Sequence, residues 1–317
     1  MVTPAEARAA RLAETPFQTT SAERVPLVRG FVRTVIDLFH QRELLSLLVR
    51  RELKARYKDS SLGFAWSLIK PFTLLLIYFI AIGQFLGAAR VIPDFAIFIF
   101  AGLTLWGLFS EIIVGGTSSI VTNAGLIKKV YLPREIFPLA ASGSAFVNFA
   151  IQFGILLGAV VVLGQFPLSW NLLYIPVAVI VASTYAIAIA IILSALNVYL
   201  RDIQYLVEVA TLVLFWASPI VYSWSFVVAT AERLSMPWLE ALYLANPVSV
   251  TIIAFQRGIW LAGSEERVMD DGTVVAAQPW PVDLDLRLAI VFGVGLVLLV
   301  IAQRVFARMQ GNFAQEI

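Results

Sequence analysis

The amino-acid sequence predicts an all-α membrane protein with six transmembrane helices and with both termini in the cytoplasm. Three observations support this prediction: an apolar composition, a series of long apolar segments, and a one-sided distribution of Lys and Arg. Of the 317 residues, 60% are hydrophobic and 14% are charged, and the mean hydropathy is +0.85. Soluble domains contain roughly 25% charged residues, so much of the surface of this chain is expected to face lipid.

The apolar segments are about as long as a helix that crosses the hydrocarbon core of a bilayer, which takes about 20 residues. We expect a transmembrane domain over residues 59–309, followed by a short cytoplasmic C-terminus, 310–317. An even number of spans puts both ends of the chain on the same side of the membrane. The six spans are expected near residues 62–87, 95–116, 136–163, 174–197, 205–224 and 286–307.

Basic residues mark the side of the membrane on which the N-terminus lies. Lys and Arg are frequent before the first span, and they recur in the loops after spans two and four and after span six. Because cytoplasmic loops are enriched in Lys and Arg, the N-terminus is expected in the cytoplasm. The opposite side has few basic residues and holds an acidic cluster, made of Glu265, Glu266, Asp270, Asp271, Asp283 and Asp285.

The segment before the first span divides into a tail and a helix. Residues 1–34 contain scattered prolines and are expected to form a flexible cytoplasmic tail. Over residues 35–53 apolar residues recur at helical spacing, and basic residues follow as far as residue 58. Such a helix is typical of the membrane interface, and a cytoplasmic helix packed on a partner is the alternative. The basic residues of this helix and segment, 35–58, are candidates for contact with lipid headgroups: Arg42, Arg50, Arg51, Lys54, Arg56 and Lys58.

The connection between spans five and six is long, and its first half, residues 236–263, is itself apolar. Pro237 and Pro247 divide this half into two pieces, each too short to cross the membrane. We therefore expect two re-entrant helices on the outer side, with Asn246, Pro247 and Arg257 as their distinctive polar and helix-breaking residues.

A seventh span near residues 241–262 is the alternative to this re-entrant pair. It would place Arg257 inside the membrane and move the basic C-terminus to the outer side, against the distribution of Lys and Arg. After the re-entrant pair, Asp271-Gly272 predicts a small hairpin.

The loop between spans two and three contains a helical piece of its own. Asn123 and Gly125 interrupt the helical pattern, and residues 124–131 form a short amphipathic segment before Pro133. A short helix across the cytoplasmic face could receive a push from a soluble motor, and an ordinary basic loop is the alternative. The candidate coupling residues are Asn123, Gly125, Leu126, Ile127, Lys128, Lys129 and Arg134.

Motifs of enzyme active sites are missing from the sequence. It contains no phosphate-binding loop of the G-x-x-x-x-G-K-[ST] type, no H-E-x-x-H and no G-x-S-x-G. Zero Cys and a single His, His40, exclude Cys-based and His-clustered metal sites. We expect no catalytic residue, metal or cofactor in this chain and no nucleic-acid partner, so that any ATP and Mg²⁺ belong to a separate subunit.

Within the predicted spans, charged residues are few and aromatic residues are frequent. Lys70, Glu111 and Glu208 are far apart in the sequence, which argues against the ion relay of a secondary transporter. Aromatic residues are common at membrane interfaces, and their rings can also stack on sugars. The candidates for lining a path for a sugar chain are Trp66, Tyr78, Phe79, Trp106, Phe109 and Tyr222.

Four segments resemble the membrane subunits of ABC-2 type exporters, especially those for O-antigen, teichoic acid and related polysaccharides. The basic segment before the family's first span is similar to RELKARYKDSSLGFAWSLIKP (51–71), and its coupling segment is similar to GLIKKVYLPREIFPLA (125–140). Two later segments of the family are similar to NVYLRDIQYLVEVATLVLFWASPIVY (197–222) and NPVSVTIIAFQRGIWLAG (246–263). The third segment holds Arg201 and Asp202, in the second cytoplasmic loop.

The resemblance implies a permease subunit that forms a homodimer docked on two copies of an ABC ATPase subunit. It implies that residues 124–131 enter a groove of the ATPase and that the 35–53 helix is a gate at the membrane interface. The implied substrate is an undecaprenyl-linked polysaccharide such as O-antigen. It would cross the inner membrane of a bacterium, driven by ATP hydrolysis in the partner, and this chain itself would not be an enzyme.

Other substrates and another class of protein stay open at the level of the sequence. An ABC-2 permease can also carry a capsule polysaccharide, teichoic acid, a drug or an antibiotic. A membrane-embedded glycosyltransferase would need carboxylates or basic residues clustered on one side near the membrane, whereas here they are scattered.

Overall fold

The computed structural model is almost entirely helical over the residues that it describes, which are 30, 36–57, 65–130, 132–264, 267–268, 274–275 and 277–316. The expected fold class, an all-α membrane protein, is confirmed. Most of the predicted tail, Lys58 and the turn at Asp271-Gly272 lie outside the described residues. Among those described, the only strands are β1 (Arg267–Val268) and β2 (Val274–Val275), which pair antiparallel.

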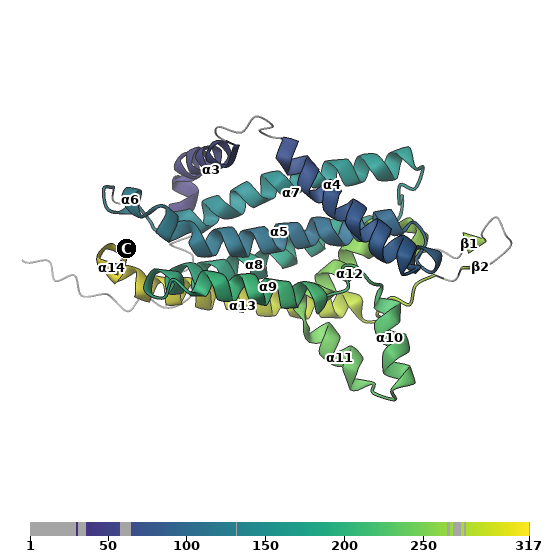
Figure 1. Ribbon diagram of the computed structural model, residues 1–317. Coiled ribbons are helices and arrows are strands. Elements are labelled where there is room, and N and C mark those ends of the chain that lie inside the picture. The colour runs from purple at the N-terminus through teal and green to yellow at the C-terminus, as the bar shows by residue number, and fades with distance from the viewer. Residues whose placement is uncertain are drawn as a thin grey trace, which may run out of the picture.

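The helices either run along the long axis of the molecule or lie near its two ends (Figure 1). Along the axis run α4 (Trp66–Tyr78) with its π-helical continuation η2 (Phe79–Phe85), α5 (Phe95–Thr122), α7 (Ile136–Val162), α8 (Tyr174–Tyr199), α9 (Ile203–Trp216) and α13 (Leu284–Met309). At one end, called the α6 end below, lie α3 (Arg42–Tyr57), α6 (Ala124–Ile127) and α14 (Phe313–Glu316). Toward the other end, called the α10 end, lie α10 (Trp224–Arg233), α11 (Trp238–Ala245) and α12 (Pro247–Ile259). Short 3₁₀ turns complete the described chain: η3 (Ala88–Arg90), η4 (Trp170–Leu173), η5 (Leu261–Gly263) and η6 (Gln310–Asn312).

Within the described residues, five helices are long and apolar enough to cross a membrane, which makes the chain a multi-pass membrane protein. They correspond in order to the predicted spans one, two, three, four and six. The pair α11 and α12 is a sixth candidate, and the two helices meet at an angle of 88°. This bend lies at Pro247, where a broken helix was expected; a re-entrant path for the pair stays a prediction. The five long helices are Trp66–Phe85, Phe95–Thr122, Ile136–Val162, Trp170–Tyr199 and Leu284–Asn312.

The predicted fifth span, 205–224, is wrong in its extent. Helix α9 has 14 residues and ends at Trp216, so it rises about 21 Å, less than the ~30 Å of a hydrocarbon core. Pro219 explains this end, because proline has no N–H and disfavours a helical conformation in the residue before it. The sequence also does not predict α10. Ser223 is the N-cap of this helix, and its side-chain oxygen accepts a hydrogen bond from the Ser225 N–H.

The turn after α9 is held by side chains of the later helices. The Asn246 Nδ2 donates to the Ala217 carbonyl at 3.4 Å, and the Gln256 Nε2 donates to the Pro219 carbonyl at 3.1 Å. Carbonyls at the end of a helix in lipid need such partners, because no water is available to them. Helix α12 therefore supplies the hydrogen bonds that a longer α9 would have made within itself.

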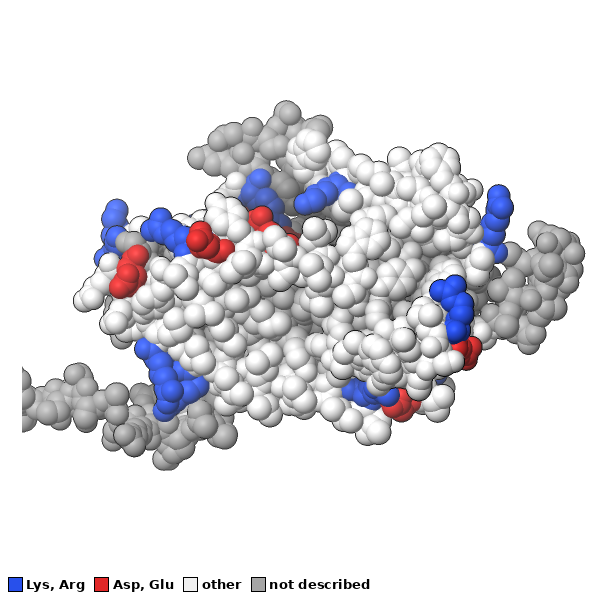
Figure 2. Space-filling model, turned by 60° about the horizontal axis from the view of Figure 1, so that its bottom comes forward, with Lys and Arg blue, Asp and Glu red and all other residues white. Residues whose placement is uncertain are grey.

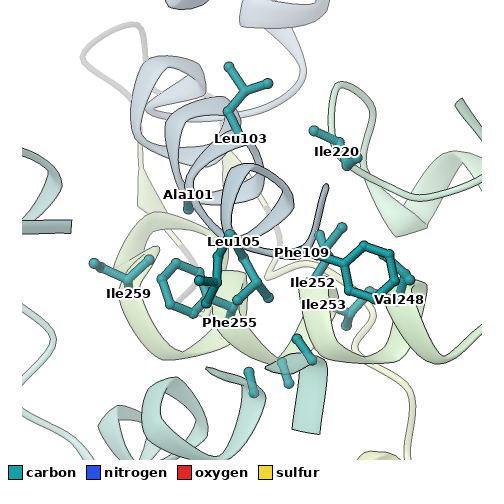
Figure 3. Close-up of a cluster of buried hydrophobic side chains, with 14 of the residues drawn as sticks. Ala101, Leu103, Leu105, Phe109, Ile220, Val248, Ile252, Ile253, Phe255 and Ile259 are labelled. Carbon is teal, nitrogen blue, oxygen red and sulfur yellow. The ribbon is translucent and has the colours of Figure 1, made fainter. Parts of the chain in front are cut away.

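Helix α5 forms the centre of the core. It packs against α7, α8, α9 and α12, and most of its side chains are buried. Figure 3 shows Leu105 and Phe109 of α5 beside Ile252, Ile253 and Phe255 of α12. Helix α12 is buried along nearly its whole length, so it is part of the core rather than a helix lying on the surface.

A second buried cluster lies at the α6 end and joins segments that are far apart in the sequence. It includes Leu48 of α3, Ile127 of α6, Phe137 of α7, Phe306 of α13 and Phe313 of α14. The N-terminal helix, the loop between α5 and α7, and the C-terminus thus share one apolar core. The same end holds the chain's C-terminus (Figure 1).

Charged side chains are unevenly distributed over the surface. On the face that Figure 2 shows, they gather toward the two ends and along one edge, and a broad uncharged area covers the middle. This pattern fits a molecule whose middle lies in the hydrocarbon core of a bilayer, where a charged side chain facing lipid is costly.

Candidate functional site

The predicted coupling segment 124–131 begins as the single helical turn α6, and Tyr131 at its end lies outside the described residues. Asn123 separates α6 from the long helix α5. Its side-chain Nδ2 donates back to the Ser119 carbonyl of α5 at 2.8 Å, and its backbone carbonyl accepts from the Leu126 N–H at 3.0 Å. One residue therefore ends the spanning helix and starts the coupling turn, so a force on α6 acts directly on α5.

The coupling segment has a buried face and an exposed face. Ile127 is 9% exposed and belongs to the cluster at the α6 end, and Leu126 packs against the same cluster. Gly125, Lys128 and Lys129 are exposed, and no atom lies within 4 Å of the position that a Cβ on Gly125 would occupy. The apolar residues thus hold α6 to its own chain, and Gly125 with the two lysines forms the surface that a partner would meet.

Of the predicted gate helix the structure describes a helical piece over 36–40, a turn at Gln41 and helix α3, which lies against α7. Leu48 is buried between them, and the Val49 side chain fills the space left by Gly143, where an added Cβ would lie 2.6 Å from the Val49 Cγ2. The close contact fixes the position of α3 along α7. The basic residues of α3 that the structure describes are all in the exposed class: Arg42, Arg50, Arg51, Lys54 and Arg56.

Two of these basic residues tie α3 to α5. The Arg51 guanidinium donates to the Asn123 Oδ1, at the start of the coupling segment. Arg56 forms an ion pair with Glu111, in the body of α5. The Arg56 and Glu111 side chains are 37% and 25% exposed, so this pair lies at the edge of the helix bundle rather than on an open surface.

Asn148 of α7 completes the group around Glu111. Its Nδ2 donates to the Glu111 Oε1 at 2.7 Å, so three helices, α3, α5 and α7, meet at one carboxylate. Asn148 is not among the residues predicted from the sequence. The signal that could have found it is a carboxamide in an otherwise apolar span, since a polar group in lipid needs a partner.

Glu52 of α3 lies beside the same group. Burial raises the pKa of the Glu52 carboxyl, the Arg56 and Arg51 guanidiniums act to lower this pKa, and Glu111 acts to raise it. Two carboxylates therefore compete for the positive charge of Arg56. In the part of the chain that the structure describes, no three His, Asp or Glu side chains lie close enough together to hold a metal ion.

Arg134, the last of the predicted coupling residues, contacts the C-terminus. Its guanidinium carbon lies 5.6 Å from the centre of the Phe313 ring, which also meets the Phe306 ring edge to face at 5.5 Å. The Tyr199 hydroxyl donates to the Met309 carbonyl at 2.8 Å. The C-terminal turn thus connects the coupling loop with the end of α8, where Arg201 and Asp202 follow as exposed residues of the turn before α9.

Two of the predicted path-lining aromatic residues contact Phe215 of α9, a residue not predicted from the sequence, and a third contacts one of these two. The Tyr78 ring lies 6.0 Å and the Trp106 ring 5.6 Å from the Phe215 ring. Phe109 lies 5.8 Å from Trp106 but is only 2% exposed, so in this conformation it is part of the core.

The other three path-lining candidates lie apart from this group. Trp66 is exposed at the start of α4, and the Phe79 ring lies 6.5 Å from the Phe95 ring. The Tyr222 hydroxyl donates to the Trp216 carbonyl at 2.7 Å and is also hydrogen-bonded to the Tyr243 hydroxyl, near the α10 end.

The selected residues of the 236–263 segment have structural partners. The Asn246 Oδ1 accepts from the Val248 N–H at 3.0 Å and so caps α12, and Pro247 occupies the first helical position, where its missing N–H has no cost. The Arg257 guanidinium carbon lies 4.8 Å from the centre of the Tyr174 ring.

Comparisons with known proteins agree over most of the chain. A family model described as ABC-2 type transporter matches residues 43–260, from α3 to the end of α12. The chain is 31% identical over 286 residues to a Myxococcus xanthus protein named "O-antigen export system permease protein RfbA". This alignment covers 90% of this chain and 100% of that protein. Two matches to Klebsiella pneumoniae proteins of the same name are 26% identical over 275 residues (86% of this chain, 94% of the relative) and 32% identical over 183 residues (57% and 69%).

Proposed function

Because this chain belongs to the ABC-2 type transporter family, we propose that it is the membrane-spanning permease of an exporter for O-antigen. The polysaccharide, carried on an undecaprenyl lipid, would cross the inner membrane of a bacterium. The observation that carries the proposal is the match, over 90% of this chain and all of its relative, to a protein named for O-antigen export. The α6 end is then the cytoplasmic end.

A separate ABC ATPase supplies the energy in this proposal, with its ATP and Mg²⁺ bound outside this chain. The sequence has no phosphate-binding loop of its own. We assign the docking surface to Gly125, Lys128 and Lys129, because these residues of the coupling segment are exposed while Leu126 and Ile127 pack inward. Two ATPase copies would serve two copies of this chain.

The homodimer is proposed to form through α4 and α9. Helix α4 buries none of its residues in the single chain, and α9 buries only two. Glu208 is exposed on α9. A carboxylate that faced lipid there would be costly, whereas one that faced a partner or a hydrated path between two copies would not. Between residues 286 and 301 of α13, by contrast, every exposed residue is apolar, as expected for a face in contact with lipid.

The hydrogen bonds around α3 suggest how the push of the ATPase would open the path. Movement of α6 would displace Asn123, which is bonded to Arg51, and so would pull on α3. Movement of α3 would in turn strain the pair between Arg56 and Glu111. We propose that this pair holds α3 in the resting position and that the lipid headgroup enters when α3 moves. The sugar chain would then pass Tyr78 and Trp106, whose rings offer stacking surfaces without a tight binding site.

Deletion of the gene tests the proposed substrate. The deletion strain should lose O-antigen from its lipopolysaccharide on gels and accumulate lipid-linked polymer inside the cell, and the wild-type gene should restore the surface polymer. Normal surface O-antigen in the deletion strain would contradict the proposed function. Loss of a capsule or of teichoic acid instead would mean that the chain is a permease for that polymer and not for O-antigen.

Gly125→Trp tests the docking surface. The added side chain has open space and should block the ATPase without disturbing the fold. Export and the binding of the ATPase in pull-down assays should both fall at least tenfold. Gly311→Trp is the matched control, because Gly311 also has open space at the α6 end but lies outside the coupling segment. Normal ATPase binding by Gly125→Trp would contradict the assignment of the docking surface to the coupling segment.

A further inference from the structure

A groove of about 570 Å³ opens between α8 and α13 at the α10 end of the molecule. Its walls are apolar and include Val177 and Val181 of α8 and Ala289 and Phe292 of α13. Trp170 and Asp285 stand at its mouth. None of these residues belongs to the coupling segment, the gate helix or the aromatic group around Phe215.

Farther along the same two helices, α8 and α13 are in tight contact. A Cβ added to Gly295 would lie 2.8 Å from the Tyr185 ring, so the two helices touch closely at that level. Toward the α10 end, the small side chain of Ala289 lines the groove together with Val177 of α8. The groove and the close contact at Gly295 thus lie at different levels of the same pair of helices.

The surroundings of the groove indicate that lipid fills it. Both helices are among those long and apolar enough to cross a membrane. The exposed face of α13 beside the groove carries large apolar side chains, Leu286, Ile290 and Val294. Trp170, at the mouth, is the type of side chain that is enriched where hydrocarbon meets the headgroups. An apolar groove between two spanning helices, flanked by exposed apolar side chains, matches an acyl chain in polarity.

The mouth of the groove has a negative charge. The Asp285 carboxylate is exposed, and its Oδ1 accepts from the Tyr174 hydroxyl at 2.6 Å. Within the described residues, neither Lys nor Arg forms an ion pair with Asp285, whereas neighbouring Asp283 is paired with Arg287 at 2.8 Å. A carboxylate offers about four acceptor positions, so Asp285 has room for further donors.

We propose that this groove binds one acyl chain of a phospholipid whose headgroup carries a primary amine, with the ammonium against Asp285. Phosphatidylethanolamine has this chemistry: its apolar tail suits a lining that includes Val177 and Ala289, and its ammonium complements the Asp285 carboxylate, which forms no ion pair within the described residues. Phosphatidylglycerol offers the same tail but no cation, so the carboxylate selects against it. The site lies on the outer side of the membrane, away from the proposed entrance for the exported polysaccharide.

The binding is tested on the full chain in nanodiscs of equal parts phosphatidylethanolamine and phosphatidylglycerol. After extraction into mild detergent, native mass spectrometry should show one retained phospholipid per copy, with phosphatidylethanolamine enriched about two- to fivefold, the range of a partly exposed ion pair. Asp285→Asn should keep the bound lipid but remove the enrichment. Ala289→Trp should fill the groove and abolish retention.

Val297→Trp is the matched control, because Val297 is an exposed residue of the same helix that does not line the groove. Its lipid retention should equal that of the wild type. A thermal unfolding series provides a second readout: added phosphatidylethanolamine should raise the melting temperature of the wild type and of Val297→Trp but not of Ala289→Trp. Unchanged retention in Ala289→Trp, or an enrichment that survives Asp285→Asn, overturns the proposal, as does retention of a polyprenyl lipid alone.

Discussion

Glu111 shows how the partners of a single residue decide what it does. Seen in the sequence, it is an isolated acid in an apolar span, and such a residue can be a functional carboxylate or one neutralised near the end of a span. The structure brings Arg56 and Asn148 to it from two other helices. The Glu111 carboxylate is therefore both ion-paired and hydrogen-bonded. It is one of the points at which the predicted gate helix is held to the bundle.

Removing Arg56 should destabilise the protein through Glu111. Arg56→Ala leaves the carboxylate without its ion partner, and Glu111→Gln removes the charge that needs one. In chemical unfolding of the protein in detergent, the double variant should therefore be more stable than the sum of the single effects implies. We expect a coupling free energy of about 0.5–1 kcal/mol, because both side chains are partly exposed. Arg42→Ala, also on α3 and exposed, is the control, and strict additivity of the two changes would contradict the pairing.

Glu135 should make stability depend on pH. Its side chain is 6% exposed, and burial raises the pKa of its carboxyl above the ordinary value, against the lowering effects of its own backbone amide and Arg134. A carboxyl whose pKa is raised in the folded state favours folding below its unfolded pKa of ~4.3 and loses that contribution as pH rises through the folded pKa. Asp37 and His40 line the same region.

Glu135→Gln removes this dependence. The variant should melt at a higher temperature than the wild type at pH 7 and above, and the difference should shrink as the pH falls toward 4. Melting temperatures measured from pH 4.5 to 8 in detergent provide the test. The exposed Glu232→Gln is the control and should leave the profile unchanged. A Glu135→Gln variant that is less stable than the wild type at pH 8 would mean that the ionised carboxylate has a favourable partner.

At the scale of secondary-structure elements, the contact between α3 and α7 can be tested directly with a disulfide. The native chain has no Cys, so introduced pairs are unambiguous. The Val49 Cβ lies 3.7 Å from the position of a Cβ on Gly143, within the range of about 3.5–4.5 Å that disulfides use. Replacing Val49 also removes the methyl group that would clash with a side chain at position 143.

Val49→Cys with Gly143→Cys should therefore lock α3 to α7 on mild oxidation. If α3 must leave α7 to admit the lipid headgroup, the oxidised protein should stop exporting, and reductant should restore export to near the unoxidised level. Thiol labelling on gels gives the fraction locked, and each single Cys variant controls for its own substitution. Full export by completely locked protein would show that α3 acts without moving.

Helix α9 and the coupling segment both differ from what their local hydropathy predicts. Helix α9 ends at Trp216 although the sequence stays apolar beyond it, because Pro219 breaks the backbone pattern and α12 supplies replacement hydrogen bonds. The coupling segment is amphipathic as predicted, but its apolar side packs on the chain's own cluster through Ile127 rather than facing outward. Pro219 is a local signal, but the hydrogen bonds from α12 and the packing of Ile127 depend on residues more than ten positions away, which a local pattern does not contain.

At the scale of the whole molecule, the exposed apolar surface divides into a face proposed for a second copy and a face proposed for lipid. Leu212 on α9 is 61% exposed and Ile290 on α13 is 55% exposed, so exposure alone does not separate them. The presence of Glu208 on α9 does, since a charge is tolerated at an interface or hydrated path and is costly in lipid.

Single Cys variants separate the two faces. In native membranes, Leu212→Cys should give a cross-linked dimer with a short bifunctional maleimide, because residues near the axis of a two-fold dimer meet their own copies. Ile290→Cys should stay monomeric under the same conditions. Equal cross-linking of both positions, or cross-linking of Ile290→Cys alone, would contradict a dimer formed through α9.

The sequence by itself determined the class of protein, the order of the spanning helices, the break at Asn246-Pro247 and the uneven placement of basic residues. These features follow from hydropathy, charge and backbone preferences, which belong to each residue and its near neighbours. Only the tertiary structure decided which side chains hold the turn after α9, which side of α6 faces outward, and that Arg56, Glu111 and Asn148 meet. Each of these depends on contacts between segments distant in the sequence, and such contacts form only when the helices pack.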